Sequence, residues 1–245
     1  MSLEVDGVVI GMAVRGSGPV RDLIKALEPF RSGHTADHNY TVSLSDDRKV
    51  FQRLQWSGCT VVRTRDPDRF TRALALHLAG HGEPATGLIR TDGVVALQGD
   101  RATVLPASLR QSLPSFERGL RSAGIVLSDA PWVDVDPHTG EVAVAAPPPW
   151  TDRFAAVAAG LPVPPRPDPV VEPGRYPLTG WYFDLVGFEE EPMTLTDAVA
   201  TVLSGLHWPL SDRDGPVAVT EMLRRTTFGS LALRTPRELA DQIRT

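Results

Sequence analysis

The amino-terminal third of the chain alternates apolar and polar residues over short stretches, which is typical of strands with one buried face. Residues 3–16 (LEVDGVVIGMAVRG) predict one or two such strands, and residues 39–64 predict three more, separated by the turn signals SDD and SG. We expect the last three to form an antiparallel meander. Two segments have helical spacing instead: residues 19–30, which begin with proline, and residues 66–82, which begin with Asp-Pro and end in glycine.

From residue 85 the pattern changes to apolar strands with one amphipathic helix among them. The strands are predicted at residues 86–90, 93–98, 102–106 and 124–129. The helix, around Phe116 to Ala123, lies between the last two strands, and this order indicates a right-handed βαβ crossover. A hairpin is predicted at residues 132–144, because the turn signal DPHTG separates two alternating segments.

Proline dominates residues 147–177, which hold ten of the 22 prolines in the chain. Because proline removes backbone donors and favours extended conformations, we interpret this stretch as a wrapping connector or an interdomain linker. A recognition peptide for an aromatic groove is an alternative. The remaining elements are strands at 178–188 and 229–234 and helices at 194–206, 215–225 and 235–244, the last with a capping box at Thr235 and Glu238.

Composition places the chain among globular proteins and excludes several kinds of partner. Its 245 residues are 42% apolar and 22% charged, which suits one large domain or two small subdomains in close contact. The formal net charge of -5 gives no broad basic field for nucleic acid or a membrane surface. The start of the chain lacks signal-peptide features and no apolar stretch reaches about 20 residues, so we expect a cytoplasmic protein. Cys59 is the single cysteine and excludes an internal disulfide.

The strand, loop, helix and strand of residues 102–129 form an order typical of phosphate-binding sites, but the loop lacks the residues that phosphate needs. In the pattern G-x-x-x-x-G-K-[ST], glycines let backbone N–H groups surround the phosphates, while the lysine and the hydroxyl contact phosphate and Mg²⁺. In an overlay on the motif LPGxSGSGKSTL, Ala107 and Ser112 stand at the glycines, Leu113 at the lysine and Pro114 at the hydroxyl. Every position that the chemistry requires is therefore replaced.

The framework around this loop nevertheless resembles the HPr kinase/phosphorylase-like family. The similar segments are LPASL, RSAG, IVLSDA and VDVDPHTGEV, with GLIRTDGVVALQGDRATVLP upstream and RYPLTGWYFDL downstream. The resemblance implies an ATP-dependent serine kinase fold related to P-loop and carboxykinase proteins, with Mg²⁺ held near the hydroxyl and an acidic pair. Of the functional positions only Ser128 and Asp129 carry over, because Ala130 replaces the second acid.

The resemblance and the predicted elements together give a fold and a domain organisation. We expect an α/β protein with a P-loop/carboxykinase-like central sheet, a small α+β amino-terminal lobe and a carboxy-terminal lobe. The expected divisions are an amino-terminal lobe at 1–84, a degenerate P-loop-type core at 85–146, a proline-rich connector at 147–177, and a lobe at 178–245 that completes the core.

The replaced positions argue against phosphoryl transfer, which depends almost entirely on positioning and charge stabilisation. Losing one preorganised donor in such a site typically costs about 3 kcal/mol, and here the lysine, the hydroxyl and the glycine cradle are all missing. We therefore expect no catalytic residue, with Asp129 and Ser128 as remnants, and no cofactor. The candidate ligand-binding residues are Ser108, Arg110, Ser112 and Arg118. The alternative is an active kinase that handles Mg-ATP through Arg110 and Asp129.

Two histidine pairs have the i, i+4 spacing of metal ligands on a helix. The candidate ligands are His34, His38, His77 and His81, with Asp37 or Glu83 in support. A metal-dependent enzyme that uses them is a second alternative. However, the first pair lies in a predicted loop, and the second straddles a helix end, where histidine interacts favourably with the helix dipole. We therefore expect no metal site.

Asp134 and Asp136 form, with Asp129, another set of carboxylates that could bind a divalent cation. On an alternating strand the two later side chains share a face, and such carboxylates usually point toward water. We expect them to be solvated.

Three tryptophans, Trp150, Trp181 and Trp208, provide aromatic surface close to the proline-rich stretch. Core packing explains most such residues, while an exposed tryptophan beside proline suits partner binding. The sequence thus favours a pseudokinase that acts as a binding or assembly subunit for a peptide or protein partner, by analogy with kinases that modify small proteins and peptide precursors. A homo-oligomer is compatible with the sequence.

Overall fold

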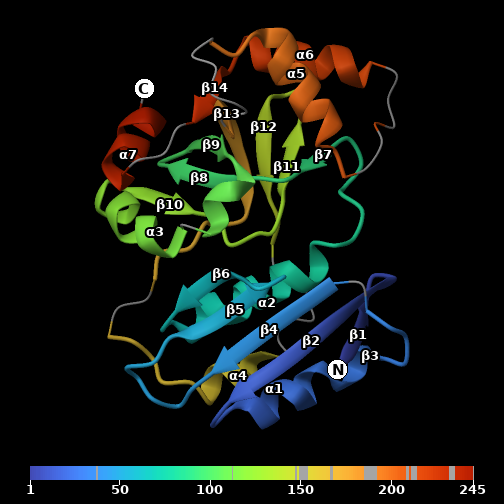
Figure 1. Ribbon diagram of the computed structural model, residues 1–245, viewed down its shortest axis with the longest axis vertical. Helices are drawn as coiled ribbons and strands as arrows, with labels where there is room; N and C mark the ends of the chain where they lie inside the picture. Colours follow the sequence, from blue (N-terminus) through green and yellow to red (C-terminus); the bar gives the residue numbers. More distant parts are fainter. Residues whose placement is uncertain are drawn as a thin grey trace. The chain divides into compact units, whose positions relative to one another are not determined.

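The computed structural model divides the chain into two compact units (Figure 1). Unit 1 contains Met1–Gly82 and Pro147–Val170, and unit 2 contains Glu83–Ala146 and Val171–Thr245. Each unit combines helices with a mixed sheet, so the predicted α/β class is confirmed. The proline-rich residues 147–177 contribute to both units. The structure describes residues 1–36, 38–111, 113–146, 148, 154–165, 168–184, 192–207, 210, 214–231 and 235–244.

A six-stranded sheet forms one layer of unit 1, with the strand order β3-β1-β2-β4-β5-β6. The strands are β1 (Ser2–Val5), β2 (Val8–Gly16), β3 (Arg31–Ser32), β4 (His38–Leu44), β5 (Gln52–Trp56) and β6 (Cys59–Thr64). The last three are antiparallel neighbours, which confirms the predicted meander. β2 and β4 are parallel, because α1 (Val20–Leu27), the 3-10 helix η1 (Glu28–Phe30) and β3 connect them.

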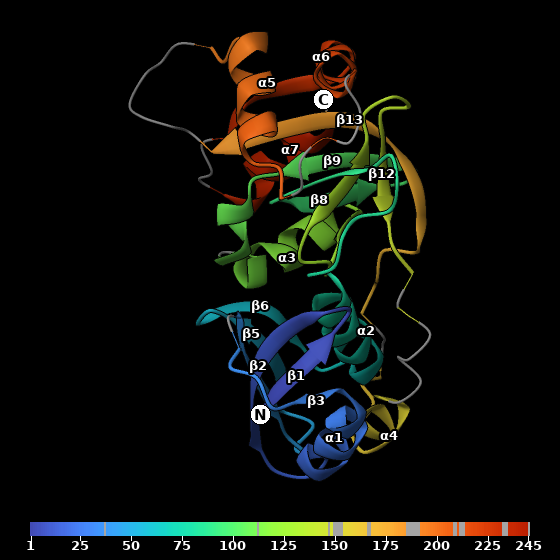
Figure 2. The same ribbon diagram turned by 90° about the vertical axis from the view of Figure 1, so that its right-hand side faces the viewer.

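Helices cover one face of this sheet. In β2, Ile10 and Met12 are buried while Ala13 and Arg15 are exposed, as the alternation of a strand requires. The covering helices are α1, α2 (Pro67–Ala79) and α4 (Ala155–Ala159), which lie on the same side of the sheet in Figure 2. The opposite face, which carries the odd-numbered side chains of β2, β4 and β5, is half-buried or exposed.

The proline-rich stretch supplies part of the core of unit 1. Phe154 and Val157 are fully buried and Leu161 is almost so, and all three belong to the same apolar cluster as the sheet and α2. Residues 154–161 therefore complete this core. They are separated from the rest of unit 1 by the whole first segment of unit 2.

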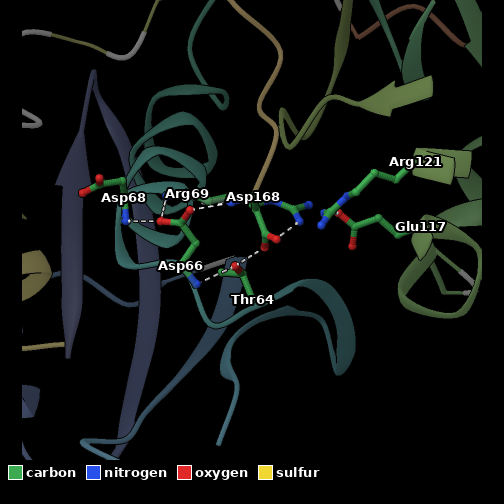
Figure 3. A network of polar contacts seen from close by, with 7 residues as sticks. All are labelled: Thr64, Asp66, Asp68, Arg69, Glu117, Arg121 and Asp168. Carbon is green, nitrogen blue, oxygen red and sulfur yellow. Dashed lines mark hydrogen bonds and ion pairs between the residues drawn. The ribbon is translucent and has the colours of Figure 1, made fainter. Parts of the chain in front are cut away.

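A network of polar contacts joins the end of this stretch to the start of α2 (Figure 3). Asp66 caps α2, because its Oδ1 accepts the backbone N–H groups of Asp68 (3.0 Å) and Arg69 (3.4 Å). Its other oxygen, Oδ2, accepts the backbone N–H of Asp168 at 2.7 Å. The Asp168 carboxylate in turn accepts the Thr64 hydroxyl at 2.6 Å and lies 3.5 Å from the Arg69 guanidinium. Two segments about a hundred residues apart are thus held by one carboxylate. Figure 3 also draws the Glu117–Arg121 ion pair of unit 2, which is 3.0 Å long.

Unit 2 contains an eight-stranded mixed sheet. Seven strands follow the order β10-β8-β9-β13-β12-β11-β7, and β14 also pairs with β13. The strands are β7 (Ile89–Thr91), β8 (Val94–Gln98), β9 (Arg101–Leu105), β10 (Ile125–Leu127), β11 (Val133–Asp136), β12 (Glu141–Val144), β13 (Gly174–Asp184) and β14 (Thr227–Leu231). The predicted hairpin at 132–144 is confirmed as β11 and β12.

Helices pack on both faces of this sheet. Alternate residues of β13 point to opposite sides, with Trp181 and Phe183 in one apolar cluster and Tyr182 in the other. The first cluster contains residues of α5 (Leu195–Ser204) and α6 (Gly215–Arg224), and the second contains residues of α3 (Leu113–Ser122) and α7 (Pro236–Arg244). Unit 2 is therefore a three-layer arrangement of helices, sheet and helices. In the described part of the chain, no helix combines the length and the apolar character needed to cross a membrane.

The predicted βαβ crossover differs from the structure in one respect. β9 and β10 are both antiparallel to β8, so they run parallel to each other with β8 between them. The helix α3 therefore connects strands that are not direct neighbours. The sequence pattern does not reveal that β8 lies between β9 and β10, because β8 precedes both strands in the chain.

Candidate functional site

The carboxyl ends of several parallel strands meet at one edge of the unit 2 sheet, where open α/β sheets usually bind ligands. β9 runs parallel to β13, β13 runs parallel to β14, and β10 has the same direction as β9. This carboxyl edge brings together the loop after Leu105, the residues after Leu127, and Asp184 at the end of β13. It is also the edge that carries residues 106–114, which the sequence analysis interpreted as a phosphate loop that has lost its phosphate-binding residues.

The loop after β9 folds into a 3-10 helix, η2 (Ala107–Gln111), instead of an open cradle. The backbone N–H of Leu109 is donated to the Pro106 carbonyl at 3.2 Å, and the Leu109 side chain is buried in the core. Ala107, which stands at the first glycine position, does not have a left-handed φ. A cradle for phosphate requires successive N–H groups that converge on one point, and such nests use the left-handed region. In η2, at least one of these N–H groups, that of Leu109, is instead bonded to a carbonyl of the same loop.

The polar side chains of η2 also contact partners within unit 2. The Ser108 hydroxyl donates a hydrogen bond to the Asp184 carboxylate, although Ser108 itself is exposed. Arg110 is 8% exposed, and its guanidinium donates to the carbonyl of Gly93. The single cation in η2 therefore points into the structure, where it satisfies a backbone acceptor.

The other positions carried over by resemblance lie near the same edge. Ser128, which is 8% exposed, accepts the backbone N–H of Ala130 at 3.1 Å and thus stabilises a local turn. Asp129 is half-buried. Arg118 lies on α3 and is exposed, whereas Ser112 lies outside the described residues. Leu113 and Pro114 form the start of α3, where Pro114 contributes no backbone donor.

Two of the four histidine candidates, His77 and His81, share one hydrogen-bonding partner in the structure. His77 and His81 lie on either side of the Tyr40 hydroxyl, with Nδ1 of His77 at 3.4 Å and Nε2 of His81 at 2.8 Å from the phenol oxygen. Tyr40 is buried, and its ring stacks on Trp56 with centroids 6.1 Å apart. His34 is exposed in the loop after β3, the side chain of His38 is not described, and Asp37 lies outside the described residues. Within the described part of the chain, no three histidine, cysteine or acidic side chains are grouped as metal ligands.

Asp134 and Asp136 have cationic partners that the sequence analysis missed. Asp134 forms a two-pronged ion pair with Arg90, with distances of 2.6 and 2.7 Å, and both side chains are mostly buried. Asp136 accepts the N–H groups of His138 and Thr139 and the Arg175 guanidinium at 2.9 Å. Burial raises the pKa of Asp136, but these hydrogen bonds outweigh it and hold the pKa below its usual value. Neither carboxylate is merely solvated, and each is used to hold strands together.

Only one of the three tryptophan candidates can be assigned an environment. Trp181 is 3% exposed and stacks on Phe183 with ring centroids 6.1 Å apart, so it packs in the core of unit 2. Trp150 and Trp208 lie outside the described residues. Another aromatic group was missed: Trp132 contacts His207 with centroids 4.4 Å apart, and His207 lies 3.3 Å from Asp92. None of the sequence signals linked these three residues.

Unit 1 carries a broad polar cavity of about 570 Å³ on the open face of its sheet. It is lined by the start of β1, by Gly11 and Ala13 of β2, by Asn39 and Thr41 of β4, and by residues 33–36 of the preceding loop. The lining combines small and polar residues with Met1, Met12 and Tyr40. Such a cavity on an open sheet face suits an extended chain better than a compact ligand, because a compact ligand has to be enclosed on most sides.

The carboxyl edge carries the Ser108 hydroxyl, the carboxylates of Asp129 and Asp184, and the buried Arg110 guanidinium. The Ser108 hydroxyl already donates a hydrogen bond to the Asp184 carboxylate. Comparison of the chain with protein-family models, with curated proteins and with solved structures finds no match to any of them.

Proposed function

We propose that this protein is a catalytically silent relative of the HPr kinase/phosphorylase-like proteins that acts as a binding or assembly subunit for a peptide or protein partner. The succession of β9, η2, α3 and β10 supports the relationship, because it follows the order in which such proteins place their phosphate loop. Because Leu113 and Pro114 stand at the lysine and hydroxyl positions of the loop, the proposed ligand is a peptide or protein and not a nucleotide.

The main support for the proposal is that polar groups of η2 already form hydrogen bonds with other groups of unit 2. Ser108 donates to Asp184, Arg110 donates to the Gly93 carbonyl, and the Leu109 N–H donates to the Pro106 carbonyl. A ligand would have to break these contacts before it could use the same donors. Breaking a hydrogen bond of a buried charged group costs about 1.5–3 kcal/mol, so Arg110 is poorly suited to turn toward a phosphate.

The residues at this edge do not fit Mg-ATP. Phosphate binding there requires a cation aimed at the β- and γ-phosphates, a hydroxyl for Mg²⁺ and a series of backbone donors. Leu113 and Pro114 replace the first two groups, and η2 replaces the third. We therefore derive no phosphoryl-transfer step for this chain.

A role in binding is supported by the open face of unit 1. One face of its sheet holds the core, while the other offers a polar cavity and exposed side chains without a covering helix among the described elements of the unit. The side chains of an open sheet face can bind an extended chain through hydrogen bonds and ion pairs.

The test is a calorimetric titration of the full chain with Mg-ATP. We expect no saturable heat at nucleotide concentrations up to about 1 mM, because the lost donors together remove most of the roughly 8 kcal/mol that a micromolar site requires. Binding with a micromolar dissociation constant would overturn the proposal.

A matched variant distinguishes a nucleotide site that the Ser108–Asp184 contact blocks from one that lacks its binding residues. Asp184→Asn weakens the contact that occupies Ser108 and leaves Leu113 and Pro114 in place. We expect this variant also to give no heat with Mg-ATP. If it binds the nucleotide where the parent chain does not, the edge is a latent nucleotide site that the Ser108–Asp184 contact regulates, and the loop is not silent.

A further inference from the structure

The open face of the unit 1 sheet carries a row of arginines at one end. Arg15 of β2 pairs in register with Ser43 of β4, Ser43 with Arg53 of β5, and Arg53 with Arg63 of β6. All three arginines occupy odd positions, opposite in direction to the buried residues of their strands, and all three are exposed. We call Arg15, Arg53 and Arg63 the arginine row. Since neighbouring strands lie about 4.8 Å apart, the row extends across about 14 Å of the sheet.

A phenylalanine supports one end of the arginine row. The guanidinium carbons of Arg63 and Arg65 lie 4.2 and 4.3 Å from the centroid of the Phe51 ring. Arg65 is further held by a hydrogen bond to the Lys49 carbonyl at 3.0 Å. Cation–π contacts of this kind orient a guanidinium while its N–H groups stay available to a ligand. Phe51 thus orients Arg63, the end member of the row, together with the neighbouring Arg65.

The arrangement is unfavourable for the isolated protein. Arg53 and Arg63 are direct cross-strand partners, and like charges placed opposite each other destabilise a sheet. Among the described residues, no carboxylate forms an ion pair with any member of the arginine row. The acids of the loop before β5, Asp46 and Asp47, accept hydrogen bonds from the Ser17 hydroxyl and the Lys49 N–H, and Asp66, which follows Arg63 in the chain, caps α2. Stability therefore does not explain these arginines, whereas a ligand with negative charges would.

The charge of the arginine row also contrasts with the rest of the molecule. The chain has a formal net charge of -5, yet unit 1 contains more arginines and lysines than aspartates and glutamates. The acidic excess lies in unit 2. The basic side chains lie on the same open face as the 570 Å³ cavity, and Ala13 and Thr41, which line the cavity, are the next residues on that face of β2 and β4.

We propose that the arginine row and the adjoining cavity bind an extended, acidic segment of the peptide or protein partner, with the carboxylates on the arginines and the backbone in the polar cavity. This inference rests on the proposed binding function and specifies the chemistry of the partner. Same-face side chains of an extended peptide are about 6.8 Å apart, so three of them span the row. Guanidinium groups bind carboxylates in a two-pronged geometry, which favours acidic side chains over dispersed dipoles.

Single-stranded nucleic acid is the competing polyanion, and the surface favours it less. Proteins that bind single strands on a sheet stack the bases on exposed aromatic rings. On this face, the Phe51 ring is already covered by Arg63 and Arg65, while Tyr40 and Trp56 occupy even positions directed to the core cluster. The arginine row offers charge without a described stacking platform.

The experiment measures fluorescence anisotropy of labelled probes with the full chain. The probes are the decapeptides (Glu-Ser)5 and (Gln-Ser)5 and the oligonucleotide dT10. We expect (Glu-Ser)5 to bind at least about tenfold more tightly than (Gln-Ser)5 at low salt, and its affinity to fall as NaCl screens the charges.

Two variants locate the interaction. Arg53→Gln combined with Arg63→Gln should weaken (Glu-Ser)5 binding about tenfold, since the two exposed charge pairs that it removes together contribute about 1.4 kcal/mol. These side chains are exposed and mutually repulsive, so the variant should fold, and its melting temperature at low salt should not fall below that of the parent. Arg237→Gln, at an exposed arginine of α7 in unit 2, is the matched control and should leave binding unchanged.

Three outcomes would overturn the inference: equal affinity for (Glu-Ser)5 and (Gln-Ser)5, unchanged binding in the double variant, or tighter binding of dT10 than of (Glu-Ser)5. Each of them leaves the proposed function standing as long as Mg-ATP does not bind. Saturable binding of Mg-ATP would instead overturn the proposed function, whatever the probes show.

Discussion

Replacing Asp66 by alanine should loosen two distant segments of unit 1 at once. The carboxylate is 4% exposed and accepts three backbone N–H groups: two at the start of α2, and that of Asp168 at 2.7 Å. Loss of an N-cap costs about 1 kcal/mol, and loss of a hydrogen bond to a charged acceptor costs about 1.5–3 kcal/mol. We therefore expect Asp66→Ala to lower the free energy of unfolding by about 2–4 kcal/mol.

Urea denaturation measures that loss, and hydrogen exchange with mass spectrometry locates it. Exchange should accelerate in residues 154–165, which Asp66 does not contact but which its bond to Asp168 retains on the core. Asp66→Asn keeps a cap acceptor and should cost less than alanine does. Asp68→Ala is the control, because Asp68 lies in the same first turn and is exposed.

The reasoning would be refuted by an Asp66→Ala variant whose stability equals that of Asp68→Ala within about 0.5 kcal/mol, which is the usual range of surface substitutions. Unchanged exchange in residues 154–165 would also contradict it. In that case, the proline-rich stretch would be held by its apolar side chains alone.

Three other substitutions test separate parts of the fold. Phe154→Ala should cost about 3–5 kcal/mol in urea denaturation, because the side chain is fully buried; a loss below about 1 kcal/mol would show that residues 154–161 are dispensable for the core. Arg90→Met should cost a similar amount, about 3–5 kcal/mol, because it leaves Asp134 buried without its cation, and Arg90→Met with Asp134→Leu should recover most of that loss. Asp136 has a lowered pKa, so its stabilising effect is complete above the unfolded aspartate pKa of about 3.9 and disappears as the pH falls through the lower folded value. Asp136→Asn should therefore reduce the acid dependence of stability below about pH 4, and an unchanged pH profile would contradict this assignment.

Much of the secondary structure follows from local signals in the sequence. Asp66 and Pro67 mark the start of α2. The Asp66 carboxylate accepts free N–H groups of the first turn, and proline is tolerated at Pro67 because the first helical residue needs no N–H donor. The DPHTG turn between β11 and β12 is equally local, since Asp136 bonds to N–H groups two and three residues ahead. Elements whose stabilising contacts lie within a few residues can be predicted in this way.

The contacts that define the candidate site are not local, and they could not be predicted. Ser108 and Asp184 are 76 residues apart and meet because β9 and β13 are parallel neighbours. The insertion of β8 between β9 and β10 is likewise a property of strand pairing across the whole sheet. The arginine row depends on registers of four strands, and no spacing in the sequence reveals which odd positions will lie side by side.

The interrupted path of the chain has a consequence for synthesis. Unit 1 begins with Met1–Gly82, but its core lacks Phe154 and Val157 until the ribosome has also produced all of Glu83–Ala146. Domains usually fold as units in order of synthesis, and here the first unit has to wait for part of the second. Its helices α1 and α2 are meanwhile left with an apolar surface that α4 has yet to cover, which is the state in which nascent chains aggregate or recruit chaperones. A fragment that ends at residue 82 or 146 should keep that surface, whereas a fragment ending near residue 170 has every segment that unit 1 needs.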